Sequence, residues 1–376
     1  MSVYISPCSS YDQAKIDRSV RGIFDTFMNR VDFTGKQVVI KPNLLMARNP
    51  DTATTTHPTL IVAAANEVLR RGGHVTIADS PGGPYNTRML KNLYRSCGLA
   101  DVFANTAVTL NYDTSSHDVP YTDDDSPKSV PIITPILDAD IIINIAKMKT
   151  HGFAFISGAV KNLFGVIPGL TKPMYHAKYP GINEFSDMLI DLCDYVRPTL
   201  SIIDGVVGME GKGPSGGRPK HAGVILGGID PYALDMVMAH MMGFDPNQCP
   251  TIVRVQKRGK GPKKLSDITI TGASIDDFCT HFIPPMDSAS RPLGFLPKFL
   301  QQPMQRLLMP YPHIDNTHCT GCGDCARTCP QHIITIENKK AVISYHKCIK
   351  CYCCHELCPI RAIEFKRFVK KQAALK

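Results

Sequence analysis

The sequence predicts an α/β fold in which a large domain, built on a mostly parallel sheet flanked by helices, precedes a small α+β domain. Two observations carry this prediction. Short, continuously apolar runs alternate with helical patterns through the first two thirds of the 376 residues, as in sheets buried on both faces. Nine of the 14 cysteines then lie between Cys319 and Cys358, which is typical of a compact metal-binding module.

The first elements of the large domain follow from apolar runs and the signals that end them. A strand buried on both faces is a short continuous apolar run, whereas a helix spaces its apolar residues three or four positions apart. The pair Gly72-Gly73 is typical of a helix C-terminus. These patterns predict a strand over residues 37–41, a helix over 59–71, a strand over 74–78 and a polar loop over 79–83.

The second half of the large domain repeats this alternation. Proline in the first turn supports the last helix, because a backbone N–H is not needed at that position. The patterns predict strands over residues 139–146, 199–204 and 222–226, and helices over 182–196 and 231–242. Alternation of this kind favours a parallel sheet with helices on both faces.

The distribution of proline, charge and cysteine divides the chain into three segments. We expect the α/β domain to cover residues 1–282, with a basic, solvated loop at 257–264 near its end. Seven prolines in residues 283–312 prevent a long helix and predict a semi-rigid linker. The cysteine-rich domain is expected to cover residues 313–370.

Composition and charge limit the classes of function. The chain carries 42 Lys and Arg against 33 Asp and Glu, and the resulting net charge of +9 invites a nucleic-acid interpretation. No helix-turn-helix, zinc-finger or RNA-binding motif supports it, so we expect no nucleic-acid partner. The start of the chain lacks the pattern of a secretory signal, and its apolar runs fall far short of the ~20 residues of a membrane helix. We therefore expect a cytoplasmic protein with no membrane span.

One cysteine motif, CxxCxxCxxxCP, occurs twice in the C-terminal region. Thiolates spaced in this way can reach three irons of one 4Fe–4S cluster, whereas the fourth cysteine of each run reaches the other cluster. The motif therefore predicts two clusters. The first would be held by Cys319, Cys322, Cys325 and Cys358, and the second by Cys348, Cys351, Cys354 and Cys329.

The repeated motif resembles the bacterial two-cluster ferredoxin domain over about residues 312–368. The alternative, a pair of zinc sites, is disfavoured because zinc modules usually lack a third cysteine in register and a proline after the fourth. Cys353 lies outside the register, and the motif gives it no role. Two oxidised clusters would reduce the net charge of +9 to about +5, which further weakens the nucleic-acid interpretation.

Polar side chains of the large domain gather where α/β proteins bind ligands, at the carboxyl ends of strands. Residues 144–152 (NIAKMKTHG) begin in the last residues of the strand predicted over 139–146 and run on toward residues 158–165 (GAVKNLFG). Lysine, histidine and asparagine there suit a carboxylate or phosphate ligand, and Lys147 or His151 suits proton transfer. The alternative is a solvated loop with helix-capping residues. The candidate catalytic residues are Lys149, His151, Lys161 and Asn162.

Several other polar sets are weaker candidates, because each alone is typical of turn chemistry. They are residues 41–43, 56–58 and 79–83, Lys172 with residues 175–176 on a loop, and Asp204 with Glu210. Residues 211–216 match GxGxxG, but a strand follows them, so no helix N-terminus is present to hold a pyrophosphate. The sequence shows no dedicated flavin motif, and it neither supports nor excludes a flavin in the large domain.

The motifs of the large domain, taken together, resemble the bacterial and archaeal domain-of-unknown-function family 362 (DUF362). The resemblance spans about residues 36–244 and is carried by KPNLL, THP, DSPGG, NIAKMKTHGFAFISGAVKNLFGVIPG, IIDGVVGMEGKGP and GGIDPYALD. It implies an iron–sulfur protein with a ferredoxin-type module, in which the segment with Lys149, His151, Lys161 and Asn162 is among the most characteristic. It implies no particular reaction.

Two functional hypotheses follow. In the first, the chain is an iron–sulfur redox protein that exchanges electrons with a low-potential redox partner and passes them to a small anionic substrate or cofactor, as a ferredoxin-dependent oxidoreductase. In the second, it is a non-catalytic electron carrier or docking adaptor whose α/β domain binds a partner protein. A deep, polar-lined cavity at Lys149 and His151 separates the two, because the adaptor hypothesis predicts none.

Overall fold

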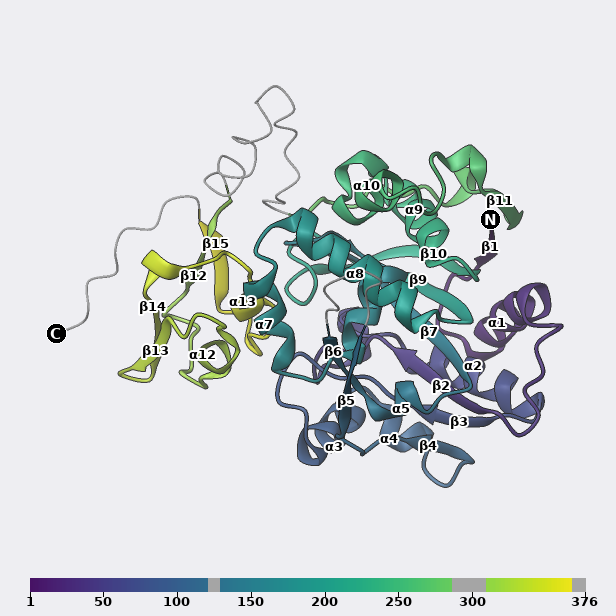
Figure 1. The fold of residues 1–376 in the computed structure, drawn as a ribbon, viewed down its shortest axis with the longest axis horizontal. Coiled ribbons are helices and arrows are strands. Elements are labelled where there is room, and N and C mark those ends of the chain that lie inside the picture. The colour runs from purple at the N-terminus through teal and green to yellow at the C-terminus, as the bar shows by residue number, and fades with distance from the viewer. Residues whose placement is uncertain (121–128, 286–308, 367–376) are drawn as a thin grey trace.

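The computed structural model describes residues 1–120, 129–285 and 309–366. Figure 1 shows a large body with a smaller module beside it. In the described residues the body contains one nine-stranded sheet in the order β11-β1-β10-β9-β7-β2-β3-β4, with β8 paired to β7. The strands are β1 (Ser2–Pro7), β2 (Gln37–Pro42), β3 (His74–Ile77), β4 (Val108–Leu110), β7 (Ile141–His151), β8 (Phe155–Ser157), β9 (Leu200–Glu210), β10 (Arg218–Gly228) and β11 (Thr269–Gly272).

The sheet is mostly parallel, as predicted. The strands β9, β7, β2, β3 and β4 are all parallel neighbours. Only β10 and the short β8 run against their neighbours in this sheet, as far as the structure describes it. After β2 the chain continues to β3, on the side of β2 away from β7. After β7 it continues to β9, on the side of β7 away from β2. The direction in which the sheet is wound therefore changes between β2 and β7.

Helices cover both faces of the sheet, and each face has its own apolar core. One core joins the sheet to α1 (Gln13–Phe27), α2 (Pro58–Arg70), α3 (Thr87–Ser96) and α4 (Leu99–Val102). The cores of the other face include α5 (Thr134–Leu137), α6 (Ala159–Asn162), α7 (Thr171–Lys178), α8 (Ile182–Val196), α9 (Pro231–Met241) and α10 (Pro250–Lys257). A separate hairpin pairs β5 (Ser116–Pro120) with β6 (Ser129–Ile133). The 3-10 turns are η1 (Pro50–Thr52), η2 (Leu163–Val166), η3 (Pro246–Gln248), η4 (Leu265–Asp267), η5 (Asp276–Phe278) and η6 (Tyr345–Lys347).

The predicted helices lie within one residue of their observed bounds, but the later strands are longer than predicted. The strand expected to end at residue 146 continues to His151, and all eleven residues of β7 are buried. Likewise β9 continues from residue 204 to Glu210. The apolar pattern stops at Ala146 because the lysines beyond it are polar, yet buried partners let the strand continue.

The C-terminal module is a small α+β domain, as predicted. Its strands form two antiparallel pairs, and its short helices lie beside each other. Cysteines make up much of its buried core. The elements are β12 (Tyr311–Ile314), α12 (Asp324–Thr328), β13 (Ile334–Glu337), β14 (Lys340–Ile343), α13 (Cys353–Glu356) and β15 (Ile363–Lys366). Most of the predicted proline-rich linker, residues 286–308, lies outside the described residues.

The module is docked on the large domain at the carboxyl edge of the parallel strands. The Ser215 hydroxyl donates to the backbone oxygen of Glu356 (2.6 Å), and Arg48 Nη2 donates to that of Cys358 (3.2 Å). Tyr352 is buried in the same core as α8. Among the described residues, every helix is too short or too polar to cross a membrane.

Candidate functional site

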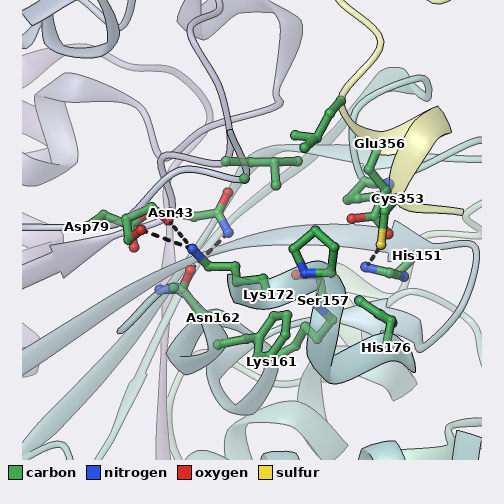
Figure 2. Close-up of a pocket in the computed structure, with 18 of the residues that line it drawn as sticks. Asn43, Asp79, His151, Ser157, Lys161, Asn162, Lys172, His176, Cys353 and Glu356 are labelled. Carbon is green, nitrogen blue, oxygen red and sulfur yellow. Dashed lines mark hydrogen bonds and ion pairs between the residues drawn. The ribbon is translucent and has the colours of Figure 1, made fainter. Parts of the chain in front are cut away.

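A cavity of about 70 Å³ lies where the module meets the sheet. It opens beside the carboxyl ends of β2 and β7, the point at which the winding of the sheet changes direction. In open α/β sheets this crevice is the usual place for a ligand. Figure 2 shows side chains of both domains around the cavity, with His151 and Lys161 from the large domain and Cys353 and Glu356 from the module.

The four candidate catalytic residues all line this cavity. Lys149 and His151 extend from the last residues of β7, and both are buried. Lys161 and Asn162 come from α6, the short helix that follows β8. The alternative of a solvated loop is therefore wrong for Lys149 and His151, because their segment is a buried strand.

Lys149 is held by neutral oxygen atoms. Its Nζ donates to Asn43 Oδ1 and to the backbone oxygen of Thr54, at 2.8 Å each. Asn43 Nδ2 in turn donates to Asn162 Oδ1 (2.9 Å). Burial, followed by repulsion from Lys147 and Lys161, lowers the pKa of Lys149 to about 7. Its charge is thus sensitive to a ligand that arrives at neutral pH.

Lys161 faces the cavity without a polar partner in the described part of the chain. Its Nζ lies 4.7 Å from the ring centre of Phe164 and 5.7 Å from that of Phe185. Aromatic faces stabilise a cation weakly, and they leave all three of its N–H groups available. Burial lowers the pKa of Lys161. An anion in the cavity would supply the hydrogen bonds that this ammonium lacks.

His151 is a neutral imidazole that accepts two backbone hydrogen bonds. Its Nδ1 accepts from the backbone N–H groups of Phe153 and Ala154, both at 3.1 Å, so this nitrogen carries no proton. The proton therefore sits on Nε2, which lies 3.2 Å from Glu356 Oε1. Burial also holds the pKa of His151 well below its usual range. The imidazole thus lies against Glu356 of the module, whose Oε1 has no hydrogen-bond partner among the described residues.

Two cavity residues on α7 were weak candidates in the sequence. Lys172 and His176 are one turn apart on this helix, and both are buried, which corrects the expectation of a loop. Lys172 Nζ donates to Ser80 Oγ and to the backbone oxygens of Ser80 and Pro81, each at 3.0 Å. Burial lowers its pKa to about 7. The spacing of four between the two residues is the signal that would have placed them on one helical face.

His176 stacks on Phe185, with ring centres 4.3 Å apart. Its Nδ1 is buried without a hydrogen-bond partner among the described residues. A buried polar atom of this kind is uncommon in folded proteins. It therefore marks this wall of the cavity as a place where a ligand or water would be stabilised.

An ion pair between β2 and the loop after β3 lies at the cavity wall. Lys41 Nζ lies 2.7 Å from Asp79 Oδ1, and both side chains are buried. Gly165 packs against this pair, and a Cβ there would lie 2.2 Å from Asp79 Oδ1. Residues 41–43 and 79–83, which the sequence favoured as turns, therefore contribute directly to the site.

Lys147 lies outside the cavity lining. Its Nζ donates to Tyr11 Oη (2.6 Å) and to Asp204 Oδ2 (2.8 Å), and both members of the ion pair are buried. The hypothesis that Lys147 supplies protons to this cavity has no geometric support, because its ammonium is committed to these partners.

The module contributes residues that the large domain's sequence patterns do not indicate. Thr328, Cys353, Glu356 and Leu357 all line the cavity. Burial raises the pKa of Glu356 to about 7, although Lys161 and Lys149 act in the opposite direction. No pattern in the sequence connects Glu356 to Lys161, since only docking of the module brings them together.

The cysteines of the first predicted set surround a second, smaller cavity of about 20 Å³ in the module. All four, Cys319, Cys322, Cys325 and Cys358, line it. The backbone N–H groups of Ala341 and Ala362 point at the sulfurs of Cys319 (3.4 Å) and Cys358 (3.2 Å). Four thiols around one cavity, two of them with backbone donors at their sulfurs, fit the requirements of an iron–sulfur cluster.

Comparisons with known proteins agree with this division of the chain. A family model described as a domain of unknown function (DUF362) matches residues 38–240, more than half of the chain. A model described as a 4Fe-4S dicluster domain matches residues 311–359. The C-terminal module is therefore an iron–sulfur domain of the ferredoxin type, which carries electrons.

The chain is also similar to individual proteins. It is 29% identical over 273 residues to the thylakoid-associated protein sll1697 of Synechocystis sp.. This match covers 69% of this chain and 80% of the relative. It is 36% identical over 56 residues to pyruvate synthase subunit PorD of Methanothermobacter marburgensis, over 15% of this chain and 65% of that one. The lactate racemase apoprotein from Thermoanaerobacterium thermosaccharolyticum matches with a TM-score of 0.42 and 13% identity, over 64% of this chain and 56% of that chain.

Proposed function

The chain belongs to the DUF362 family, and from this premise we propose that it is an iron–sulfur oxidoreductase that passes electrons to a small anion bound between its two domains. The single observation that carries this proposal is the cavity itself. It is lined by lysines of the large domain on one side and by residues next to the cluster cysteines on the other.

The proposal includes two 4Fe–4S clusters, one on each cysteine set. When bound, the clusters would supply single electrons at low potential. In the second set, Cys329 and Cys354 directly follow Thr328 and Cys353, which line the cavity. Leu357, which precedes Cys358 of the first set, lines the cavity as well, so ligands of both sets are chain neighbours of the cavity wall.

The balance of charge around the cavity favours an anion. Three lysines and two carboxylates line it, which leaves an excess of one positive charge when all five are ionised. The histidines add none, because burial keeps His151 and His176 neutral. A carboxylate or a phosphate is the class of ligand that this excess selects.

Each polar residue then has a distinct role. Lys161 binds the anion, because its ammonium has no other polar partner in the described residues. Lys149 and Asn162 orient it, since the hydrogen bonds through Asn43 fix both side chains. His151 Nε2 lies 3.2 Å from Glu356 Oε1 and packs against this carboxyl group without a hydrogen bond to it. The small volume of the site excludes most water and strengthens these electrostatic contacts.

The alternative, a docking adaptor without chemistry, predicts no deep polar cavity at Lys149 and His151. A buried cavity with charged walls therefore supports the oxidoreductase over the adaptor. Burying several lysines lowers the stability of the folded protein. Ligand binding would explain why these lysines are buried, whereas an adaptor role would not.

Anion binding by the anaerobically purified holoprotein tests the proposal. We expect calorimetric titration with phosphate and with small carboxylates to detect binding of at least one of them. Lys161→Met should weaken that binding by about tenfold or more, since one charge-assisted hydrogen bond contributes about 1.5–3 kcal/mol. Lys178→Met, an exposed residue of the same wall helix α7, should leave it unchanged.

Iron content and the EPR signals of the reduced protein are measured on every variant. If Lys149→Met and Lys161→Met kept full iron and also kept wild-type anion affinity and turnover, the site assignment would be wrong.

A further inference from the structure

The two cysteine runs of the module have very different surroundings. Every residue from Tyr352 to Cys358 is buried, and Tyr352 packs in the core of the large domain. The first run, in contrast, exposes Cys322 and the neighbouring Thr320. A protein that approaches from solvent can therefore reach the first run but not residues 352–358.

Contacts with the large domain close the side of the second run. His355 Nε2 lies 3.3 Å from the backbone oxygen of Lys212, and the Ser215 hydroxyl donates to the backbone oxygen of Glu356. At Gly82, a Cβ would lie 2.5 Å from Leu357 Cδ2. This face is an interface within the molecule. Cys348 and Cys351 of the second run are partly exposed, and Cys322 of the first run is the most exposed of the predicted cluster ligands in the described residues.

An apolar residue stands at the centre of the exposed face. Ile360 is 41% exposed, and it lines the same small cavity as Cys322. An apolar centre beside a redox centre, surrounded by polar groups, is the usual composition of a small protein–protein contact. Electron-transfer contacts are among the smallest of these.

The rim of this face is basic. Lys339 and Arg361 are exposed, and neither forms an ion pair within the described residues. Lys340 Nζ donates to the backbone oxygen of Cys319 (2.6 Å). Among nearby acidic groups, Asp324 is paired with Arg327 and Asp315 with His318, whereas Glu337 forms no ion pair in the described residues. Lys339 and Arg361 therefore give this rim two unpaired positive side chains, although an oxidised cluster beneath it would itself carry about −2.

From this geometry we infer that the face around Cys322 and Ile360 is the docking surface for an acidic one-electron carrier protein. Each encounter oxidises the carrier by one electron and reduces the module by one. The inference rests on the proposed function for the direction of electron flow. Positive charge around the contact accelerates association with an acidic partner, and added salt removes that advantage.

The test is the rate at which two donors of opposite charge reduce the holoprotein in a stopped-flow experiment. Reduced flavodoxin serves as the acidic carrier, and the methyl viologen radical cation as the small cationic donor. The variant is Lys339→Asp combined with Arg361→Asp. Aspartate is chosen because both positions have positive φ, 60° and 57°, which Asp tolerates better than most residues.

We expect the double variant to lower the second-order rate constant with flavodoxin about tenfold at low salt. The rate with methyl viologen should stay equal or rise. A matched control, Lys15→Asp with Arg18→Asp, reverses two exposed charges on α1, at the opposite end of the molecule in Figure 1, and should change neither rate.

Two outcomes would overturn the inference. One is a flavodoxin rate that falls no further in the variant than in the control. The other is a wild-type flavodoxin rate that does not decrease with ionic strength, a result that needs no variant to fold. Reduction is followed without any anion present, so a failure of the proposed anion site would leave this result unaffected.

Discussion

At the scale of single residues, the lysines of the cavity differ in how many hydrogen bonds their ammonium groups are free to donate to a ligand. Lys172 uses its ammonium on Ser80 and Pro81, whereas Lys161 has aromatic contacts and the attraction of Glu356 but no hydrogen bond in the described part of the chain. Desolvating a charge without hydrogen bonds is unfavourable, and this cost is incurred when the protein folds. An anion that binds Lys161 recovers part of it, which makes Lys161 the strongest candidate for ligand contact.

The pH dependence of anion binding should follow from two of these lysines. The pKa values of Lys149 and Lys172 are lowered to about 7, so both are charged below that pH and lose charge above it. An anion prefers a charged lysine, and it also prefers an uncharged Glu356, whose pKa is raised to about 7, so its affinity should fall as pH rises through 7. The expected slope is about tenfold per pH unit for each lysine that must be protonated.

Calorimetric titrations on both sides of neutral pH measure this slope. Lys149→Met should bind more weakly and show a shallower dependence, whereas the exposed control Lys178→Met should retain the wild-type slope. An affinity that stays constant across this range in the wild-type protein would contradict the assignment of these two lysines.

At the scale of elements, one buried carboxylate places the helix that carries Lys161. Asp235 on α9 accepts from the backbone N–H groups of Ala159 (2.6 Å) and Val160 (3.2 Å), the first residues of α6. Gly158 leaves room for this contact, because a Cβ there would lie 2.1 Å from Asp235 Oδ1. A helix of four residues has little stability of its own, so its position depends on this tertiary cap.

Asp235→Ala should therefore damage both stability and the site. Two buried N–H groups would lose their acceptor, at about 1–3 kcal/mol each, and α6 with Lys161 would shift. Urea unfolding measures the first effect and anion titration the second. Asp230→Ala, which removes the N-cap of α9 itself, should cost only about 1 kcal/mol and leave anion binding intact.

The two aspartates lie on the same helix, which makes the comparison a close one. Equal anion affinity in Asp235→Ala and in Asp230→Ala would show that α6 keeps its place without the carboxylate.

Element boundaries show where sequence patterns stop being informative. The helix over Ile182–Val196 was predicted with its observed bounds, because its apolar period continues over its whole length. The strand β7 was predicted to end five residues early. Its last residues include Lys149 and His151, whose buried state depends on partners far away in the chain.

At the scale of the whole molecule, the candidate site exists only when the module is docked. Glu356 and Cys353 close the cavity from the module, and His151 of β7 lies against Glu356. The cores of the large domain do not depend on cysteine ligands, whereas cysteines form much of the module's core. Loss of iron should therefore destabilise the module's side of the site and leave the large domain's side folded.

Removing the iron with a chelator under anaerobic conditions should unfold the module and abolish anion binding. Metal binding and folding are coupled in small cysteine-rich domains. Hydrogen exchange should increase over residues 311–366 and at residues 212–216, which contact the module, while β2 and α2 stay protected. Reconstitution with iron and sulfide should restore both binding and protection. Anion binding by the iron-free protein with unchanged affinity would show that the site does not need the module.

The sequence by itself determined the fold class, the repeated cysteine motif and the set of Lys149, His151, Lys161 and Asn162. These features are local, since apolar periodicity and ligand spacing are set by residues that are neighbours in the chain. Only the tertiary structure decided that the four residues share one cavity, that Lys147 is excluded from it and that Glu356 completes it. Burial and charge pairing depend on which surfaces meet, and no local pattern records the docking of the module on β7.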